Sequence, residues 1–127
     1  MIRVLVVDDE ENNLDLVERL FHGRFQVRRA SSGLEGLALV SREPFDIALI
    51  DFMMPGTNGI EFLVEARRRA PELPAIMVTG YGDMPELLSA HQSELCAAIV
   101  WKPWTVEELG ELVEKHALRE PRTGTGG

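Results

Sequence analysis

Five short apolar runs, rich in β-branched residues, alternate along the chain with longer segments of helical periodicity. Such alternation is typical of a parallel sheet, because each helix carries the chain back across the sheet to begin the next parallel strand. The chain is therefore predicted to adopt an α/β fold around a five-stranded parallel sheet. The predicted strands are Ile2–Val7, Phe25–Arg28, Asp46–Ile50, Ala75–Thr79 and Ala97–Trp101.

Five helices are expected between and after these strands. Apolar side chains recur at helical spacing in three segments, and each set is expected to face the core. The sets are Leu14, Val17 and Leu20, then Leu34, Leu37 and Val40, then Ile60, Leu63 and Val64. A short fourth helix is expected from Glu86 to Leu95, where polar residues dilute the apolar face, and a fifth from Val106 to about Leu118.

Polar pairs three residues apart mark where three of these helices are expected to begin. This is the spacing of a capping box, in which a side chain accepts a hydrogen bond from an amide in the first turn of the helix. The pairs are Asn58 and Glu61, Asp83 and Glu86, and Thr105 and Glu108.

The length and charge of the chain limit what it can do. Its 127 residues suffice for one packed domain and are too few for two ordinary ones. We expect a domain over residues 1–119 and a disordered tail or linker over residues 120–127, because that segment has no apolar side chain to bury. A formal net charge of −8 argues against binding of nucleic acid through the bulk surface.

Cysteine usage and the length of the apolar runs indicate the compartment. Cys96 is the only cysteine, which excludes an internal disulfide and leaves no cysteine pair for zinc or redox chemistry. The longest apolar run, from Cys96 to Trp101, has six residues, and the N-terminus has no signal-peptide pattern. A cytoplasmic protein without membrane association is therefore expected.

Polar residues lie at the carboxyl ends of four predicted strands. Right-handed crossovers bring the carboxyl ends of parallel strands to one edge of the sheet, where ligands bind. The residues at this edge are Asp8 and Asp9 after the first strand, Asp51 after the third, Thr79 at the end of the fourth, and Lys102 after the fifth. We therefore expect these side chains to meet in one site.

Three carboxylates in one place repel one another, so the acidic cluster makes sense only with a cation. Oxygen ligands favour a hard ion such as magnesium, which binds one or two carboxylates and accepts phosphoryl oxygens. Phosphoryl transfer also needs an in-line nucleophile and positive charge around the equatorial oxygens. Asp51 is the candidate nucleophile, the metal and Lys102 the candidate positive charges, and Thr79 a candidate hydroxyl donor.

Several of the polar and aromatic residues have simpler structural explanations. An Asp after a strand often only caps the next helix. The three histidines, His22, His91 and His116, lie at or near helix ends without spaced ligand partners, so we expect them to be structural or solvated. Cys96 is expected to be a small buried residue at the start of the fifth strand, and Trp104 to cover the core beside the last helix.

Four stretches of the sequence resemble the signature stretches of response-regulator receivers of two-component systems. They are Val-Val-Asp-Asp-Glu at 6–10, Asp-Phe-Met-Met-Pro-Gly-Thr-Asn-Gly at 51–59, Val-Thr-Gly-Tyr-Gly-Asp at 78–83 and Trp-Lys-Pro-Trp at 101–104. The resemblance covers residues 2–118, and the four stretches together are far more specific than any one of them.

The resemblance implies a flavodoxin-like fold with strand order 2-1-3-4-5 and five helices. It also implies that Asp51 is phosphorylated. Magnesium would be bound by Asp9, Asp51 and the backbone carbonyl of Met53, with Asp8 acting largely through a bound water.

The resemblance implies further roles around the phosphoryl group. Lys102 would pair with it, and Thr79 would move toward it on activation. Met53 and Tyr81 would flank it and tune its hydrolysis, and Pro55 and Gly59 would shape the loop that carries Met53.

The same resemblance implies partners and an output. The phosphodonor would be the phosphohistidine of a sensor histidine kinase or of a phosphotransfer protein. The output would be altered binding to an output domain or target protein, and a homodimer could form through the face between the fourth and fifth helices. The domain would be a phosphoacceptor that catalyses its own phosphorylation and slow dephosphorylation, not an enzyme that turns over a metabolite.

Two positions depart from the family pattern. Receivers usually carry Tyr or Phe three residues before the lysine, as a rotamer switch coupled to the threonine, but Ile99 stands there in this chain. We expect Ile99 to weaken the coupling between phosphorylation and the far face. The segment Ser93-Glu94-Leu95-Cys96-Ala97 replaces the usual Gly-Ala turn and is one residue longer, which is expected to alter the output or dimerisation face.

Two functions from other classes remain open at this point. A magnesium-dependent hydrolase with an aspartyl-phosphate intermediate is one, but Met53 stands where its acid/base Asp would follow Asp51, and the chain has no cap insertion. A receiver-like docking module without phosphorylation is the other. Ile99 favours it, whereas the acidic cluster, Thr79 and Lys102 argue against it.

Overall fold

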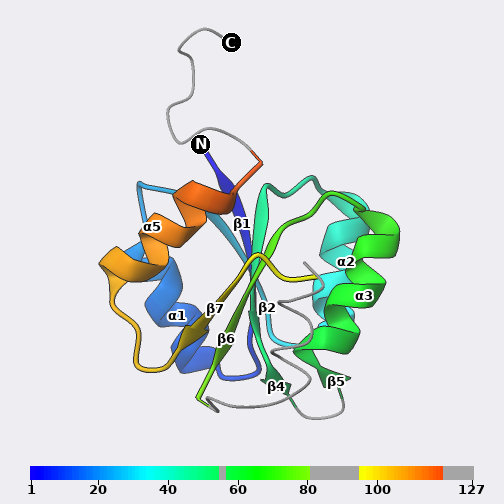
Figure 1. Cartoon of the computed structure of the whole chain (residues 1–127), viewed down its shortest axis with the longest axis horizontal. Coiled ribbons are helices and arrows are strands. Elements are labelled where there is room, and N and C mark those ends of the chain that lie inside the picture. Colours follow the sequence, from blue (N-terminus) through cyan, green and yellow to red (C-terminus); the bar gives the residue numbers. More distant parts are fainter. Residues whose placement is uncertain (55–56, 81–94, 119–127) are drawn as a thin grey trace, which may run out of the picture.

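A computed structural model describes residues 1–54, 57–80 and 95–118 (Figure 1). A five-stranded sheet forms its centre, built from β1 (Arg3–Val7), β2 (Gln26–Ala30), β3 (Ile47–Asp51), β6 (Ala75–Thr79) and β7 (Ala98–Trp101). The order across the sheet is β2-β1-β3-β6-β7, and every neighbouring pair is parallel. The predicted parallel sheet and its order 2-1-3-4-5 are confirmed.

Helices cover both faces of this sheet. They are α1 (Glu11–Leu20), α2 (Gly33–Arg42), α3 (Gly59–Arg69) and α5 (Val106–His116). Figure 1 shows α1 and α5 on one face and α2 and α3 on the other. The described ranges thus contain four helices where five were expected, and the segment predicted as the fourth lies almost entirely outside them, in residues 81–94. None of these four helices is long and apolar enough to span a membrane.

Each face of the sheet has its own apolar core. Along β1, Leu5 and Val7 pack toward α2 and α3, whereas Val4 and Val6 pack toward α1 and α5. All five residues of β3 and of β6 are buried. Strands covered on both faces carry continuous apolar runs instead of an alternating pattern, which explains why these runs stand out in the sequence.

Backbone pairing moves the strand ends by one or two residues from the prediction. The second strand runs from Gln26 to Ala30, because Arg29 and Ala30 pair with Val6 and Val7 although Arg29 is not apolar. The third strand includes Asp51, which pairs with Val78. Asp51 therefore ends its strand and does not follow it.

Three residues predicted to face the core are exposed instead: Leu20, Leu34 and Val64, of which Leu34 is 82% exposed. Helix α2 buries Gly33, Gly36, Leu39 and Val40, and helix α3 buries Gly59, Phe62, Leu63 and Ala66. Small residues let these two helices approach closely, so the buried stripe is rotated from the one that the large apolar residues indicated.

Helix ends follow the predicted capping pairs where the structure describes them. Asn58 and Glu61 form a complete capping box at α3, and the Thr105 side chain accepts a hydrogen bond from the Glu108 amide at α5. The pair expected at residues 83 and 86 lies outside the described residues. Helix α5 ends at His116, two residues before the predicted end, because Ala117 has extended dihedral angles (φ −63°, ψ 149°).

Other expectations about single residues are met. Cys96 is 1% exposed two residues before β7, and burial raises the pKa of its thiol. Trp104 packs against the core under α1 and α5. His22 is exposed after α1, and His116 is the last residue of α5, whereas His91 lies outside the described residues.

Gly36 sets the distance between α2 and α3. A Cβ at this position would lie 2.8 Å from Cε1 of Phe62 and 3.2 Å from Cγ2 of Val7. We expect Gly36→Ala to lower the free energy of unfolding by about 1–2 kcal/mol, although alanine is the better helix former, because an added methyl overpacks the core. Urea unfolding followed by circular dichroism measures the change.

The Phe62 ring is the obstacle in this account. Phe62→Leu combined with Gly36→Ala should therefore cost less than the sum of the two single substitutions. Strictly additive costs would show that the ring is not what limits the approach of the two helices.

Candidate functional site

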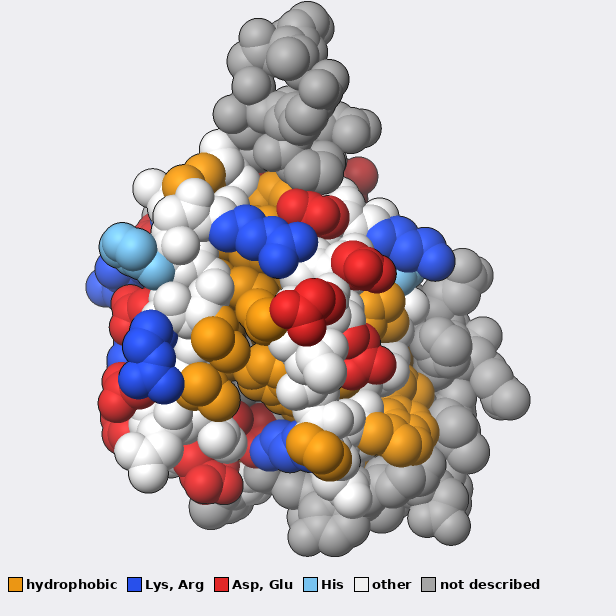
Figure 2. All heavy atoms as spheres, turned by 90° about the vertical axis from the view of Figure 1, so that its left-hand side faces the viewer, with side chains coloured by type: hydrophobic (Ala, Val, Ile, Leu, Met, Phe, Trp, Pro, Cys, Tyr) orange, Lys and Arg blue, Asp and Glu red, His pale blue; other side chains and the backbone are white. Residues whose placement is uncertain are grey.

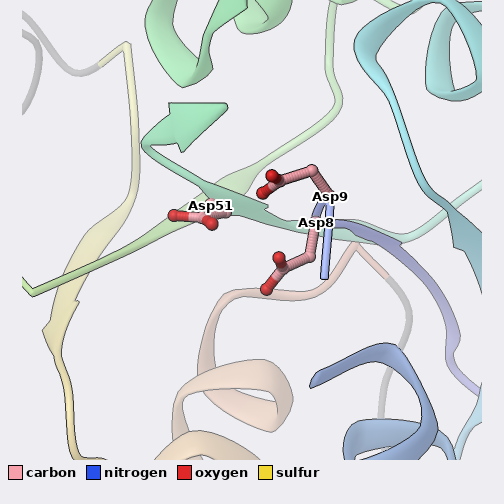
Figure 3. Close-up of side chains that lie close together, drawn as sticks. All are labelled: Asp8, Asp9 and Asp51. Atoms are coloured by element: carbon pink, nitrogen blue, oxygen red, sulfur yellow. The ribbon is translucent and has the colours of Figure 1, made fainter. Parts of the chain in front are cut away.

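The three predicted carboxylates meet at the carboxyl edge of the sheet. One oxygen from each of Asp8, Asp9 and Asp51 lies within 4.8 Å of the others. Figure 3 shows Asp8 and Asp9 at the end of β1 and Asp51 at the end of β3 beside it. Asp8 and Asp51 are each 8% exposed, and Asp9 is exposed. Two buried carboxylates and one open to solvent thus surround a space of ionic size.

Hydrogen bonds orient Asp8. Its amide continues the sheet by donating to the Ala30 carbonyl at 3.1 Å. Its Oδ1 accepts from the Glu10 amide at 2.9 Å, which is an Asx turn, and its Oδ2 accepts from Asn13 Nδ2 at 3.1 Å. The N-cap of α1 is Glu10. The capping explanation therefore does not account for either Asp8 or Asp9.

Asp51 has a cation beside it. Lys102 Nζ lies 3.9 Å from Asp51 Oδ2, and the lysine side chain remains 34% exposed. The Lys102 amide donates to the Thr79 carbonyl at 2.8 Å, which extends the pairing of β7 with β6 by one residue. The Lys102 side chain is therefore anchored at its base and reaches across β6 to the carboxylate.

Thr79 and Ile99 lie on the other side of the sheet edge. Val78 lines the same cavity as Asp51 and Lys102 under α1 and α5, so alternation along β6 directs Thr79, 1% exposed, toward α2 and α3. Ile99 is half-buried against the core on that side. The structure thus brings Thr79 to the same edge as the acidic cluster and places Ile99 below it in the next strand.

A short hairpin that the sequence did not predict follows Asp51. Its strands are β4 (Met53–Met54) and β5 (Thr57–Asn58), paired antiparallel. Gly59 donates its amide to the Phe52 carbonyl at 2.7 Å, and a Cβ on Gly59 would lie 3.0 Å from the Asp51 carbonyl oxygen. A glycine here lets α3 begin directly against the end of β3, so it helps to hold the loop that carries Met53. Pro55 and Tyr81 lie outside the described residues.

A cavity of about 410 Å³ opens beside the acidic cluster, between α1 and the segment that joins β7 to α5. Asp8, Asn13, Asp51 and Lys102 form its polar part. The rest is largely apolar, with Leu16, Leu20, Trp104 and Val106 among the lining residues. Figure 2 shows hydrophobic side chains gathered on this face of the molecule, with charged side chains around them.

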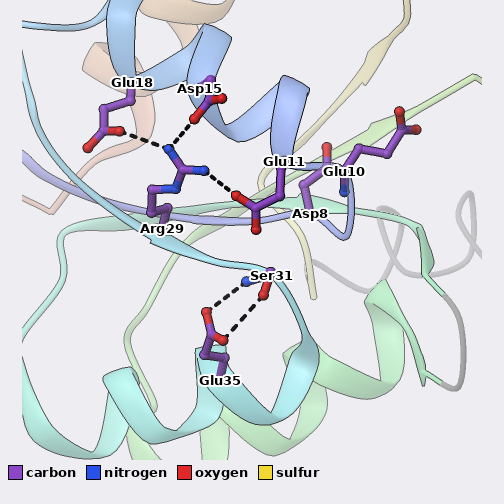
Figure 4. A network of polar contacts seen from close by, with 8 residues as sticks. All are labelled: Asp8, Glu10, Glu11, Asp15, Glu18, Arg29, Ser31 and Glu35. Carbon is purple, nitrogen blue, oxygen red and sulfur yellow. Dashed lines mark hydrogen bonds and ion pairs between the residues drawn. The ribbon is translucent and has the colours of Figure 1, made fainter.

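Arg29 fixes helix α1 over the sheet. Its guanidinium contacts three carboxylates along one side of α1, those of Glu11, Asp15 and Glu18, at 2.5, 2.5 and 3.0 Å (Figure 4). The hydrogen bonds that Arg29 donates to Asp15 and then to Glu18 raise the pKa of Arg29 above its usual value. Helix α1 begins two residues after Asp9. The contacts of Arg29 therefore also position the helix that directly follows Asp8 and Asp9.

We expect Arg29→Met to speed amide hydrogen exchange in α1 while exchange in β3 and β6 stays slow, because those buried strands do not depend on the clamp. Raising the salt concentration should reproduce part of the effect in the wild type, since the pairs are exposed. Arg28→Met is the matched control, because Arg28 on the same strand pairs with Glu43 and not with α1. Equal exchange in the two variants would contradict a clamp on α1.

Comparison with known proteins decides the family. A family model of the response regulator receiver domain matches residues 4–114. The chain belongs to this family. The resemblance seen in the four sequence stretches is thereby confirmed, and the sheet order agrees with it.

Three relatives illustrate the match. The receiver is 37% identical over 112 residues to the hydrogenase transcriptional regulatory protein HoxA of Cupriavidus necator, covering 88% of this chain and 23% of HoxA. It is 27% identical over 115 residues to sporulation initiation phosphotransferase F of Bacillus subtilis, covering 90% of this chain and 92% of that protein. The solved structure of response regulator protein TrrA from Thermotoga maritima, in complex with Mg2+-BeF, has a TM-score of 0.79 and 31% identity, covering 91% of this chain and 98% of that one. The receiver thus spans less than a quarter of HoxA but nearly all of the other two.

Sequence reasoning missed two residues that shape this site, Asn13 and Arg29. Asn13 offered only its position, five residues after Asp8 in the first turn of a predicted helix. Arg29 offered no signal, because its partners lie 11 to 18 residues away in the chain.

Proposed function

We propose that this receiver accepts a phosphoryl group from a kinase or phosphotransfer phosphohistidine onto Asp51, in a magnesium-dependent reaction. The observation that carries the proposal is the surroundings of Asp51. Its buried carboxylate has the oxygens of Asp8 and Asp9 within 4.8 Å and Lys102 Nζ at 3.9 Å. Both kinds of group that phosphoryl transfer needs, a nucleophile and a positive charge beside it, are present.

The residues fit a magnesium ion. All the side chains in the cluster offer oxygen, the donor that hard divalent cations prefer. Both oxygens of Asp8 already accept hydrogen bonds, so Asp9 and Asp51 are the better direct ligands, and Asp8 suits a role through a bound water. The Met53 carbonyl is the proposed backbone ligand. The structure of TrrA was solved with Mg2+-BeF, which supports magnesium as the ion of the present receiver as well.

The chemistry then follows from the positions of the side chains. An oxygen of Asp51 attacks the phosphorus, the bond from phosphorus to the donor histidine nitrogen breaks, and that nitrogen takes up a proton. When bound, magnesium neutralises charge on the phosphoryl oxygens. Lys102 supplies a second positive charge from the side of β7, and Thr79 supplies a hydroxyl from the end of β6. Burial of Asp51 keeps bulk water from competing with its carboxylate.

The output of this reaction is a change in binding. We propose that Thr79 responds to the phosphoryl group and that Ile99, packed on the same side of the sheet, transmits less of that response than an aromatic residue would. Met53 and Tyr81 are proposed to tune hydrolysis. The proposed target is an output domain or a separate target protein, and a homodimer is the alternative; the relative HoxA, of which the receiver spans 23%, is named a transcriptional regulatory protein.

The first test is metal binding. Asp9→Asn should weaken magnesium binding at least about tenfold, equivalent to about 1.4 kcal/mol, because it removes a carboxylate ligand. Tryptophan fluorescence reports binding, since Trp104 lines the cavity that Asp8 and Asp51 also line. Glu72→Gln removes an equal charge beyond α3 and should leave the affinity unchanged. Similar losses in both variants would point to general charge and not to a site.

The second test is phosphorylation. Acetyl phosphate and magnesium should add one phosphoryl group, lost on hydroxylamine treatment, to the wild type and none to Asp51→Asn. Lys102→Ala should slow the addition by about tenfold or more, because it removes a positive charge from the transferring oxygens. The matched control is Lys115→Ala, which removes an exposed lysine of α5. Intact mass spectrometry measures all four proteins, and added mass that persists in Asp51→Asn would refute the assignment.

A further inference from the structure

We propose that Asn13 is a positioning residue that orients Asp8 and thereby gives the acidic cluster its preference for magnesium over larger divalent cations. The inference rests on the proposed function, because it concerns the metal that the cluster would hold. It adds a residue that belongs to none of the four receiver-like stretches.

The contact itself is direct. Asn13 Nδ2 donates to Asp8 Oδ2 at 3.1 Å, and Asn13 is half-buried in the wall of the cavity that Asp8, Asp51 and Lys102 also line. Within the described residues, the Asp8 carboxylate accepts one other hydrogen bond, from the Glu10 amide to Oδ1. Without Asn13, the carboxylate would keep one donor and could turn about it.

The chemistry of the donor matters as much as its place. An amide donates a hydrogen bond without adding charge, whereas lysine or arginine at this position would cancel the negative charge of Asp8. Asn13 therefore fixes the direction of the carboxylate and leaves its charge available to a cation. Proteins commonly adjust the affinity of a metal site through residues that do not bind the metal but hydrogen-bond to the residues around it and orient them.

Contacts on two sides hold helix α1, and Asn13 lies on its remaining side. The stripe that faces the cavity contains Asn13, Leu16 and Leu20. A second stripe, Leu14 and Val17, is buried in the core. A third stripe forms ion pairs with Arg29 and consists of Glu11, Asp15 and Glu18 (Figure 4). The backbone amide of Asn13 donates to the Glu10 carbonyl at 3.0 Å, in the first turn of the helix. Rotation of α1 would break both the core contacts and the Arg29 contacts, so the side-chain amide of Asn13 has a defined direction.

Orientation affects different cations differently. Magnesium demands near-ideal octahedral geometry at short distances, whereas calcium accepts six to eight oxygens in flexible arrangements. A carboxylate that is free to turn therefore harms magnesium binding more than calcium binding. A residue that only stabilised the fold would change both affinities by the same factor.

The experiment compares magnesium and calcium affinities of the full chain by tryptophan fluorescence and calorimetry. Asn13→Leu keeps the size of the side chain but removes the donor, and it should weaken magnesium binding about tenfold and calcium binding much less. Asn12→Leu is the matched control, because Asn12 is the exposed neighbour on the same helix. It should leave both affinities unchanged. Asn13→Gln, which retains an amide donor, should recover part of the magnesium affinity.

Outcomes separate this inference from the function on which it rests. Magnesium binding by the wild type with no loss in Asn13→Leu, or an equal loss for both cations, overturns the inference and leaves the proposed function standing. No magnesium binding by the wild type overturns both. Should Asn13→Leu unfold, Asn13→Ser and the side-chain amide resonance of Asn13 in the metal-free protein decide the matter. That resonance should shift strongly in Asp8→Ala, and an unchanged resonance refutes the contact.

Discussion

The candidate site depends on one charged side chain, Asp51, at the end of a buried strand. Strand β3 lies at the centre of the sheet, all five of its residues are buried, and Asp51 is the last of them. A carboxylate at this depth is costly unless charges or donors compensate it. The strands end at the same edge, and the end of β7, two strands away, supplies Lys102, whose Nζ lies 3.9 Å from Asp51 Oδ2. The cation that offsets the cost of burying Asp51 is therefore also one that the proposed phosphoryl transfer would use.

Most of the candidate site was predictable, because topology alone brings strand ends together. The rule that parallel strands finish at one edge was enough to place Asp8, Asp51 and Lys102 in one site, although they are far apart in the chain. What topology cannot supply is the direction of each side chain. Asn13 and Arg29 act through contacts made between helix and strand, and such contacts leave no periodic or local pattern in the sequence.

The strands, the helices and their order could be predicted from the sequence, but which face of each helix is buried could be predicted less well. Leu34 and Val64 belong to apolar stripes, yet both are exposed. On each of the two helices, either of two overlapping stripes could face the core. The close contact of Gly36 with Phe62 determines which stripe is buried. The hairpin after Asp51 escaped prediction for a different reason. Strands of two residues have too few positions to show the alternation by which a strand is recognised.

The sheet edge divides the candidate site between two compartments. Asp8, Asp51 and Lys102 face the cavity under α1 and α5, whereas Ile99 packs against the core under α2 and α3, and alternation along β6 directs Thr79 to that side. After gene duplication, a copy could therefore acquire a new phosphodonor through changes on the first side while keeping its old response, or keep its donor and change its response through the second. Under the proposed function, such a division would separate the residues that meet the phosphodonor from those that carry the response.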